Sequence, residues 1–168
     1  MPTLIKDGRI VENDWTLVAE VADGPIATLT IVPLAYALSH GDALFGAGRQ
    51  IGVWLDGDAE PNELVGLLDR IALIAIRFST VNDGRGLSIA VLLRTRLGFK
   101  GELRAIGEVH EDVLHYMRRC GIDSYELPDG HDPSIALAAL KPYSEYYQGS
   151  VVDPRPAFRR IARGGKAR

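Results

Sequence analysis

The residues best suited to chemistry in this sequence form a short loop, Asp83-Gly84-Arg85-Gly86, which the pattern places between a strand and a helix. Free backbone N–H groups at the start of such a helix, together with the Arg85 guanidinium, could bind a small oxyanion, and Ser88 lies one turn further on. A structural interpretation explains the same residues, because Asp83 can cap the helix while the glycines make the turn. Taken alone, the loop favours the structural interpretation.

Arg104 is the second unusual residue, since it lies within a segment that reads as a strand covered on both faces. An unpaired charge there would cost on the order of several kcal/mol, so Arg104 needs a carboxylate or a bound anion. Glu102 shares its strand face, and Asp83 or Glu126 could complete the pairing. An ion-pair network is favoured slightly over a ligand contact.

Loops that leave neighbouring parallel strands emerge at the same end of a sheet, which places Glu108 and Asp112 near the Asp83 loop. The candidate anion or ligand site therefore comprises six residues: Asp83, Arg85, Ser88, Arg104, Glu108 and Asp112. No residue is assigned a catalytic role.

Metal and thiol sites are not predicted. His110 and His115 are five residues apart and diverge around a helix, and neither His40 nor His131 has ligand-like neighbours in the sequence. Cys120 continues an apolar helical stripe and reads as a buried structural cysteine. The glycine pattern at residues 84–86 is incomplete as a dinucleotide fingerprint, so no cofactor is identified.

The elements that position these residues alternate regularly along the chain. Apolar runs predict strands at residues 29–34, 51–55, 73–78, 102–107 and 124–127, and amphipathic stretches predict helices near 36–46, 61–70, 86–97, 110–120 and 133–141. Consecutive βα units predict an α/β fold with a mostly parallel five-stranded sheet. A partial barrel like that of a TIM barrel is slightly favoured, and an open doubly wound sheet is the alternative.

The two ends of the chain differ from this repeat. Residues 1–25 predict a small N-terminal hairpin, and the sequence beyond Pro142 reads as an extended C-terminal arm. We expect a single domain over residues 1–150, followed by a flexible basic tail over residues 151–168. A partial barrel has open edges, which makes a homodimer that covers one edge plausible.

Charge is distributed unevenly. Residues 155–168 contain six basic and no acidic residues, so the net charge of −3 leaves −9 on the preceding 154 residues. Such an acidic body argues against a nucleic-acid surface. The sequence contains no apolar run long enough to span a membrane, and its N-terminus does not resemble a secretory signal, so we expect a cytoplasmic protein without a membrane partner.

Many of the same residues carry a resemblance to a known family. The matching residues are Asp83-Gly84-Arg85-Gly86 with Ser88 and Ala90, Leu92-Leu93-Arg94, Arg96, Gly101-Glu102-Leu103-Arg104-Ala105, Gly107, Val109, Asp112 and Arg119-Cys120-Gly121, together with Asp14-Trp15, Gly52-Val53-Trp54-Leu55 and Tyr146-Tyr147-Gln148. In these residues the sequence resembles a bacterial family of unknown function whose members are described as oxidoreductases involved in sulfite reduction. Their genes typically lie beside those for assimilatory sulfite reductase.

The resemblance implies a role in sulfur assimilation. It is compatible with an oxidoreductase or electron-transfer component of sulfite reduction, and also with a non-catalytic accessory protein that binds sulfite reductase. The sequence departs from the usual family pattern at four positions: Ser79, Glu108, Val113 and Ile122.

Overall fold

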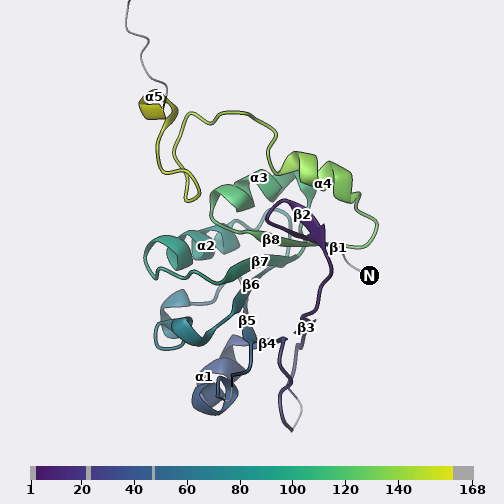
Figure 1. The fold of residues 1–168 in the computed structure, drawn as a ribbon, viewed down its shortest axis with the longest axis vertical. Coiled ribbons are helices and arrows are strands. Elements are labelled where there is room, and N and C mark those ends of the chain that lie inside the picture. The colour runs from purple at the N-terminus through teal and green to yellow at the C-terminus, as the bar shows by residue number, and fades with distance from the viewer. Residues whose placement is uncertain (1–2, 22–23, 47, 161–168) are drawn as a thin grey trace, which may run out of the picture.

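The computed structural model describes residues 3–21, 24–46 and 48–160 and contains one curled sheet of eight strands (Figure 1). Its centre consists of five parallel strands that are neighbours in chain order: β4 (Thr30–Pro33), β5 (Ile51–Leu55), β6 (Leu73–Phe78), β7 (Glu102–Gly107) and β8 (Ser124–Leu127). These are the five predicted strands, within a residue or so at each end. An open doubly wound sheet would require a reversal of strand order, so the barrel-like alternative is the one observed.

The sheet is larger than the expected five strands because the N-terminal segment joins it. Strands β1 (Thr3–Lys6) and β2 (Arg9–Val11) form the expected hairpin around Asp7 and Gly8, which both have positive φ. This is the conformation that an Asp-Gly hairpin turn favours. Strand β1 pairs antiparallel with β8, and a short strand β3 (Thr16–Leu17) pairs parallel with β4.

The connection between β2 and β3 requires the sheet to curl. These strands lie at opposite edges of the sheet, yet only residues 12–15 separate them in the chain. In a flat sheet, seven strand spacings would place them about 34 Å apart. The chain from Val11 to Thr16 can reach about 18 Å at most, so the sheet must bend into a half-barrel.

Helices cover the outer face of the half-barrel (Figure 1). They are α1 (Leu34–Leu44), α2 (Arg85–Thr95), α3 (Glu111–Arg119) and α4 (Pro133–Ala139). The helix expected over residues 61–70 is wrong. Two 3-10 turns, η1 (Pro61–Leu64) and η2 (Leu68–Arg70), replace it, and Gly66 between them is a poor residue for a helix interior. No helix within the described ranges has both the length and the apolar character needed to cross a membrane.

Alternation along β7 separates the two faces of the sheet. Leu103 and Ala105 belong to the large apolar core beneath the helices, whereas Ile106 belongs to a smaller inner cluster with Trp15 and Trp54 at its edge. Glu102 and Arg104 share the inner face with Ile106, because side chains alternate with a period of two. A buried arginine therefore lies inside the half-barrel.

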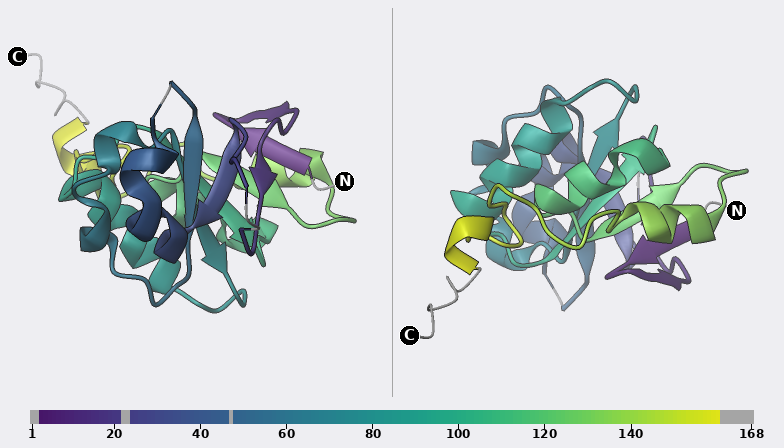
Figure 2. Two further views of the ribbon diagram at one scale, coloured as in Figure 1. Left: turned by 90° about the horizontal axis from the view of Figure 1, so that it is seen from below. Right: turned by 90° about the horizontal axis from the view of Figure 1, so that it is seen from above.

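The C-terminal arm leaves α4 and folds back along the end of α3 before a short helix, α5 (Ala157–Arg160). In both views of Figure 2, α5 lies on the side of the molecule far from the N-terminal hairpin. The Val151 amide donates to the Arg119 carbonyl at 3.0 Å, so this part of the expected tail contacts the body. Residues 161–168 of that tail lie outside the described residues.

Candidate functional site

The loop between β6 and α2 is organised around an ion pair between Asp83 and Arg85. Arg85 donates from Nε to Asp83 Oδ1 at 2.9 Å and from Nη2 to Oδ2 at 2.8 Å. The backbone N–H of Arg85 also donates to Asp83 Oδ1, at 3.1 Å, and Ser79 Oγ donates to Oδ2 at 3.3 Å. Both carboxylate oxygens of Asp83 thus accept hydrogen bonds from residues of the same loop region.

These contacts define the electrostatics of the loop. The Arg85 side-chain hydrogen bonds, and then its backbone hydrogen bond, lower the pKa of Asp83 from 3.8 to about 2. The Asp83 carboxylate is therefore ionised at neutral pH and neutralises Arg85. An oxyanion at this loop would have to compete with Asp83 for the guanidinium.

A second pair lies at the same end of the sheet, where Asp56 directly follows β5 and Arg77 lies in β6. Arg77 donates to both oxygens of Asp56, at 2.6 and 2.7 Å, and its guanidinium carbon lies 4.7 Å from the Trp54 ring centroid. The loop that contains Asp56 also approaches the first pair, since a Cβ on Gly57 would lie 3.1 Å from Asp83 Oδ2. The sequence reasoning did not identify the Asp56–Arg77 pair, although Arg77 stands out as the charged residue in an otherwise apolar strand.

Three other predicted residues lie in elements that begin or end at this carboxyl end. Ser88 is exposed in α2, and Asp112 is exposed in the first turn of α3. Glu108 follows β7, and its Oε2 lies 3.2 Å from His110 Nε2, so its observed contact is with a histidine and not with Arg85. The structure places these residues on neighbouring elements, while Asp83 and Arg85 contact mainly each other.

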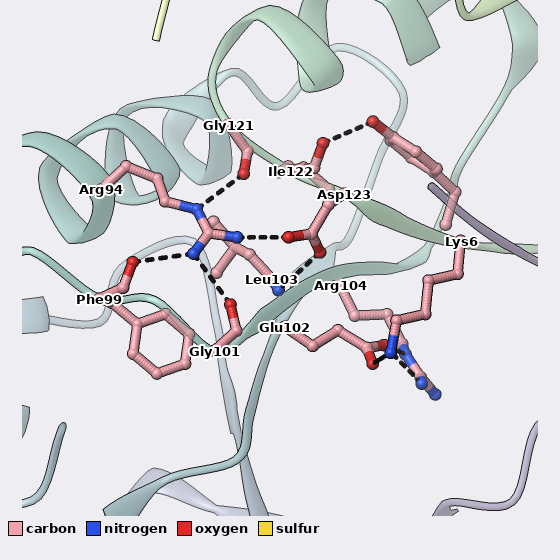
Figure 3. A network of polar contacts seen from close by, with 11 residues as sticks. Lys6, Arg94, Phe99, Gly101, Glu102, Leu103, Arg104, Gly121, Ile122 and Asp123 are labelled. Atoms are coloured by element: carbon pink, nitrogen blue, oxygen red, sulfur yellow. Dashed lines mark hydrogen bonds and ion pairs between the residues drawn. The ribbon is translucent and has the colours of Figure 1, made fainter. Parts of the chain in front are cut away.

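Arg104 is separate from the rest of the predicted set. It lies inside the half-barrel and is only 1% exposed (Figure 3). Its Nη2 and Nε donate to Glu102 Oε1 at 2.6 and 2.8 Å, and its Nη1 donates to Asn13 Oδ1 at 2.9 Å. Lys6 Nζ contacts the other oxygen of Glu102 at 2.6 Å. The expected pairing of Arg104 with a carboxylate is thus present.

This inner cluster keeps Glu102 charged despite its burial. Burial alone would raise the pKa of Glu102, but the Lys6 ammonium and the Arg104 guanidinium outweigh it and lower the pKa below its usual value. With Asn13 supplied by the segment that crosses from β2 to β3, the cluster ties that segment to the inner face. Its observed contacts are structural.

Arg94 is the centre of a second polar network on the other side of β7 (Figure 3). It donates to Asp123 Oδ2 at 2.6 Å and to three backbone carbonyls, those of Phe99, Gly101 and Gly121. The remaining oxygen of Asp123 accepts from the Leu103 amide at 2.9 Å. Burial raises the pKa of Asp123, although the Leu103 hydrogen bond and the Arg94 charge oppose that shift. In the sequence, Arg94 stood out only as one of the residues that carry the family resemblance.

A pocket of about 510 Å³, which we call the arm pocket, lies between the C-terminal end of α3 and the arm. The arm is held there by Arg119, whose guanidinium carbon lies 4.4 Å from the Tyr146 ring centroid. The lining includes four basic residues and two acidic ones: Arg118, Arg119, Lys141 and Arg155, with Glu145 and Asp153. The sequence showed an arm but gave no sign that it would enclose a pocket.

The histidines are also arranged differently from the sequence-based expectation. His131 comes from the loop between β8 and α4, and its Nδ1 lies 2.9 Å from Glu111 Oε1. Its ring also meets the His110 ring edge-on, with 4.9 Å between centroids. His131 therefore does have ligand-like neighbours, but they are about 20 residues away in the chain and no local spacing reveals them.

Cys120 ends α3 and is half-buried, in keeping with a structural role. Burial raises the pKa of its thiol, and the nearby Arg119 charge only partly offsets this. The thiol is consequently protonated at neutral pH and is a poor nucleophile.

Comparison with known proteins identifies the family. No curated protein matches the sequence. Residues 52–158, from β5 through the arm, match a family described as bacterial protein of unknown function (DUF934). The match covers well over half of the 168 residues and includes the Asp83 loop, Arg94, Arg104 and the arm pocket. The chain therefore belongs to this bacterial family.

Proposed function

We propose that this protein acts in assimilatory sulfite reduction, as an oxidoreductase or electron-transfer component. The resemblance in sequence suggests the process, and the arm pocket is the observation that best supports a ligand-binding role. The pocket lies within the family match, which extends to residue 158.

The chemistry of the arm pocket suits an anion. Arg118, Arg119, Lys141 and Arg155 outnumber the two acids of its lining, and guanidinium groups bind oxyanions through directed hydrogen bonds. Its volume lies in the range of pockets that hold small organic ligands. It could therefore accept sulfite or a larger anionic redox cofactor.

An accessory protein that binds sulfite reductase is the second candidate, favoured by exposed aromatic side chains on and beside the same arm. Tyr147 is 76% exposed, Phe158 62% and Tyr143 60%. Tyrosine, phenylalanine and arginine are enriched at protein interfaces, where aromatic anchors supply much of the binding energy. This arrangement is what a docking arm on a larger redox enzyme would present.

Growth of a deletion strain tests the process. We expect impaired growth on sulfate and on sulfite as sole sulfur source, with rescue by sulfide. Normal growth on all three sources, in a strain without a second copy of the gene, would contradict a role in sulfite reduction.

Complementation with variants then separates the two candidates. Loss of rescue by a folded Arg118→Gln/Lys141→Gln double variant, but not by Tyr147→Ser/Phe158→Ser, would favour ligand binding in the arm pocket. The reverse pattern, with loss of sulfite reductase from pull-downs, would favour docking. Arg96→Gln serves as the matched control, because Arg96 is an exposed arginine at the end of α2. Visible absorption between roughly 350 and 500 nm would directly reveal a flavin.

A further inference from the structure

Two loops at the carboxyl end of the sheet bring together three side chains with metal-binding groups. His110 and Glu111 come from the loop and first turn that follow β7, and His131 comes from the loop that follows β8. One nitrogen from each histidine and one Glu111 oxygen all lie within 4.8 Å of one another. The closest pair, His131 Nδ1 and Glu111 Oε1, is 2.9 Å apart.

We propose that His110, Glu111 and His131 form a binding site for a divalent first-row transition-metal ion, with Zn²⁺ as the reference ion. Two imidazoles and one carboxylate are a ligand set that suits zinc and its neighbours. Ligand atoms bonded to one tetrahedral zinc ion lie about 3.3 Å apart, given metal–ligand bonds of about 2.0–2.1 Å. The three groups therefore need to close by about 1.5 Å at most, which small rotations of surface side chains can provide.

The surroundings of the three residues also favour a cation. Glu108 Oε2 lies 3.2 Å from His110 Nε2, the kind of carboxylate contact that orients a metal-bound imidazole. With both histidines neutral, Glu108 and Glu111 would compensate the two positive charges of the ion. The N-terminal end of α3 carries the positive end of the helix dipole, which disfavours a cation. The negative charge of Asp112 in the first turn of α3 offsets this effect.

The three side chains are accessible to solvent, and they would leave one coordination position of a bound metal ion open. The side chains of His110, Glu111 and His131 are 33%, 23% and 20% exposed. Three protein ligands leave a position for water or a substrate oxygen, as in catalytic zinc sites. The cluster lies at the N-terminal end of α3 and the arm pocket at its C-terminal end, so this proposal does not rest on the proposed function.

Metal binding by the full-length protein tests the proposal. After removal of metal with a chelator, Zn²⁺ binding is measured by calorimetry and Co²⁺ binding by its visible absorption. We expect one equivalent of metal at the cluster. Glu108→Gln should weaken binding by about 10- to 100-fold, as is usual for a residue that orients a ligand, and His131→Asn or Glu111→Gln by at least as much. His115→Asn is the matched control, because His115 lies on α3 outside the cluster, and it should leave the affinity unchanged.

A second measurement does not depend on the variants folding. The chain has four histidines, so their imidazole signals can be resolved by NMR in the unmodified protein. Zn²⁺ should shift the signals of His110 and His131 and leave those of His40 in place. The proposal is overturned if Zn²⁺ does not bind, if His131→Asn binds it as tightly as the unmodified protein, or if the shifts fall on His40 or His115 alone.

Discussion

Arg94 and Asp123 form a 2.6 Å ion pair that joins the last turn of α2 to the residue before β8, 29 residues further along the chain. The pair fixes three elements at once. Arg94 of α2 also donates to the carbonyls of Gly101, which precedes β7, and of Gly121, which follows α3. Asp123 in turn accepts from the Leu103 amide in β7. This contact gives a structural role to Arg94, which carries the family resemblance but is not among the six candidate site residues.

Removing this arginine should therefore destabilise the fold. We expect Arg94→Ala to lower the free energy of unfolding by about 3 kcal/mol, because it leaves three carbonyls and a half-buried carboxylate without their partner. Urea denaturation measures the change. Arg96→Ala, two residues on and exposed, should stay within about 0.5 kcal/mol of the unmodified protein. Equal losses in both variants would contradict the special role of Arg94.

The inner cluster predicts that substitution of Glu102 destabilises the fold more than substitution of Lys6, although the two residues form an ion pair. Glu102→Gln should cost about 3–5 kcal/mol, because it leaves the Arg104 charge buried without a carboxylate. Lys6→Met should cost about 1 kcal/mol or less, since the Lys6 side chain is 42% exposed and its charge is solvated. Thermal or urea unfolding of the two variants provides the comparison. A larger effect from Lys6→Met would show that Arg104 does not depend on Glu102.

The Asp83–Arg85 pair predicts a specific pH dependence. Because the folded-state pKa of Asp83 is lowered from 3.8 to about 2, the pair stabilises the fold above pH 3.8 and loses that contribution as the pH falls through about 2. Carboxyl carbon NMR should show Asp83 titrating near 2, and Arg85→Gln should raise its pKa toward 3.8. Asp132 is the internal control, because hydrogen bonds from Ser134 lower its pKa and should be unaffected by the change.

Gly121 should be less tolerant of a side chain than another glycine with a similar backbone. Gly121 and Gly130 have φ angles of 97° and 92°, so alanine is strained at both, by about 1–3 kcal/mol. At Gly121 the new Cβ would also lie 2.7 Å from Arg94 Cγ and 2.9 Å from Val151 Cγ1, whereas nothing lies within 4 Å at Gly130. Gly121→Ala should therefore be the more destabilising change.

The same substitution should loosen the arm. Because Val151 would be displaced, limited proteolysis within residues 141–156 should be faster in Gly121→Ala than in Gly130→Ala. Identical cleavage in the two variants would indicate that the arm is not held through Val151.

The sequence by itself determined the local elements and their order. The parallel strands were predictable because apolar runs such as residues 71–76 suit both faces of a covered sheet. The ends of α3 followed from Glu111, Asp112, Arg118 and Arg119, whose charges suit the helix dipole. The sequence slightly favoured a sheet in which strands pair with their neighbours in chain order. It did not exclude an open doubly wound sheet, because that sheet satisfies the same local rules.

Only the tertiary structure decided which side chains meet. The need of Arg104 for a carboxylate could be predicted from the sequence, because burial of an unpaired charge has a large cost in any topology. The separation of Arg104 from Arg85 could not be predicted in this way. The contact between His131 and Glu111, like that between Arg94 and Asp123, depends on how two loops are placed by strand pairing and curl. No periodicity along the chain encodes such contacts, because they join residues 20 to 29 positions apart through space.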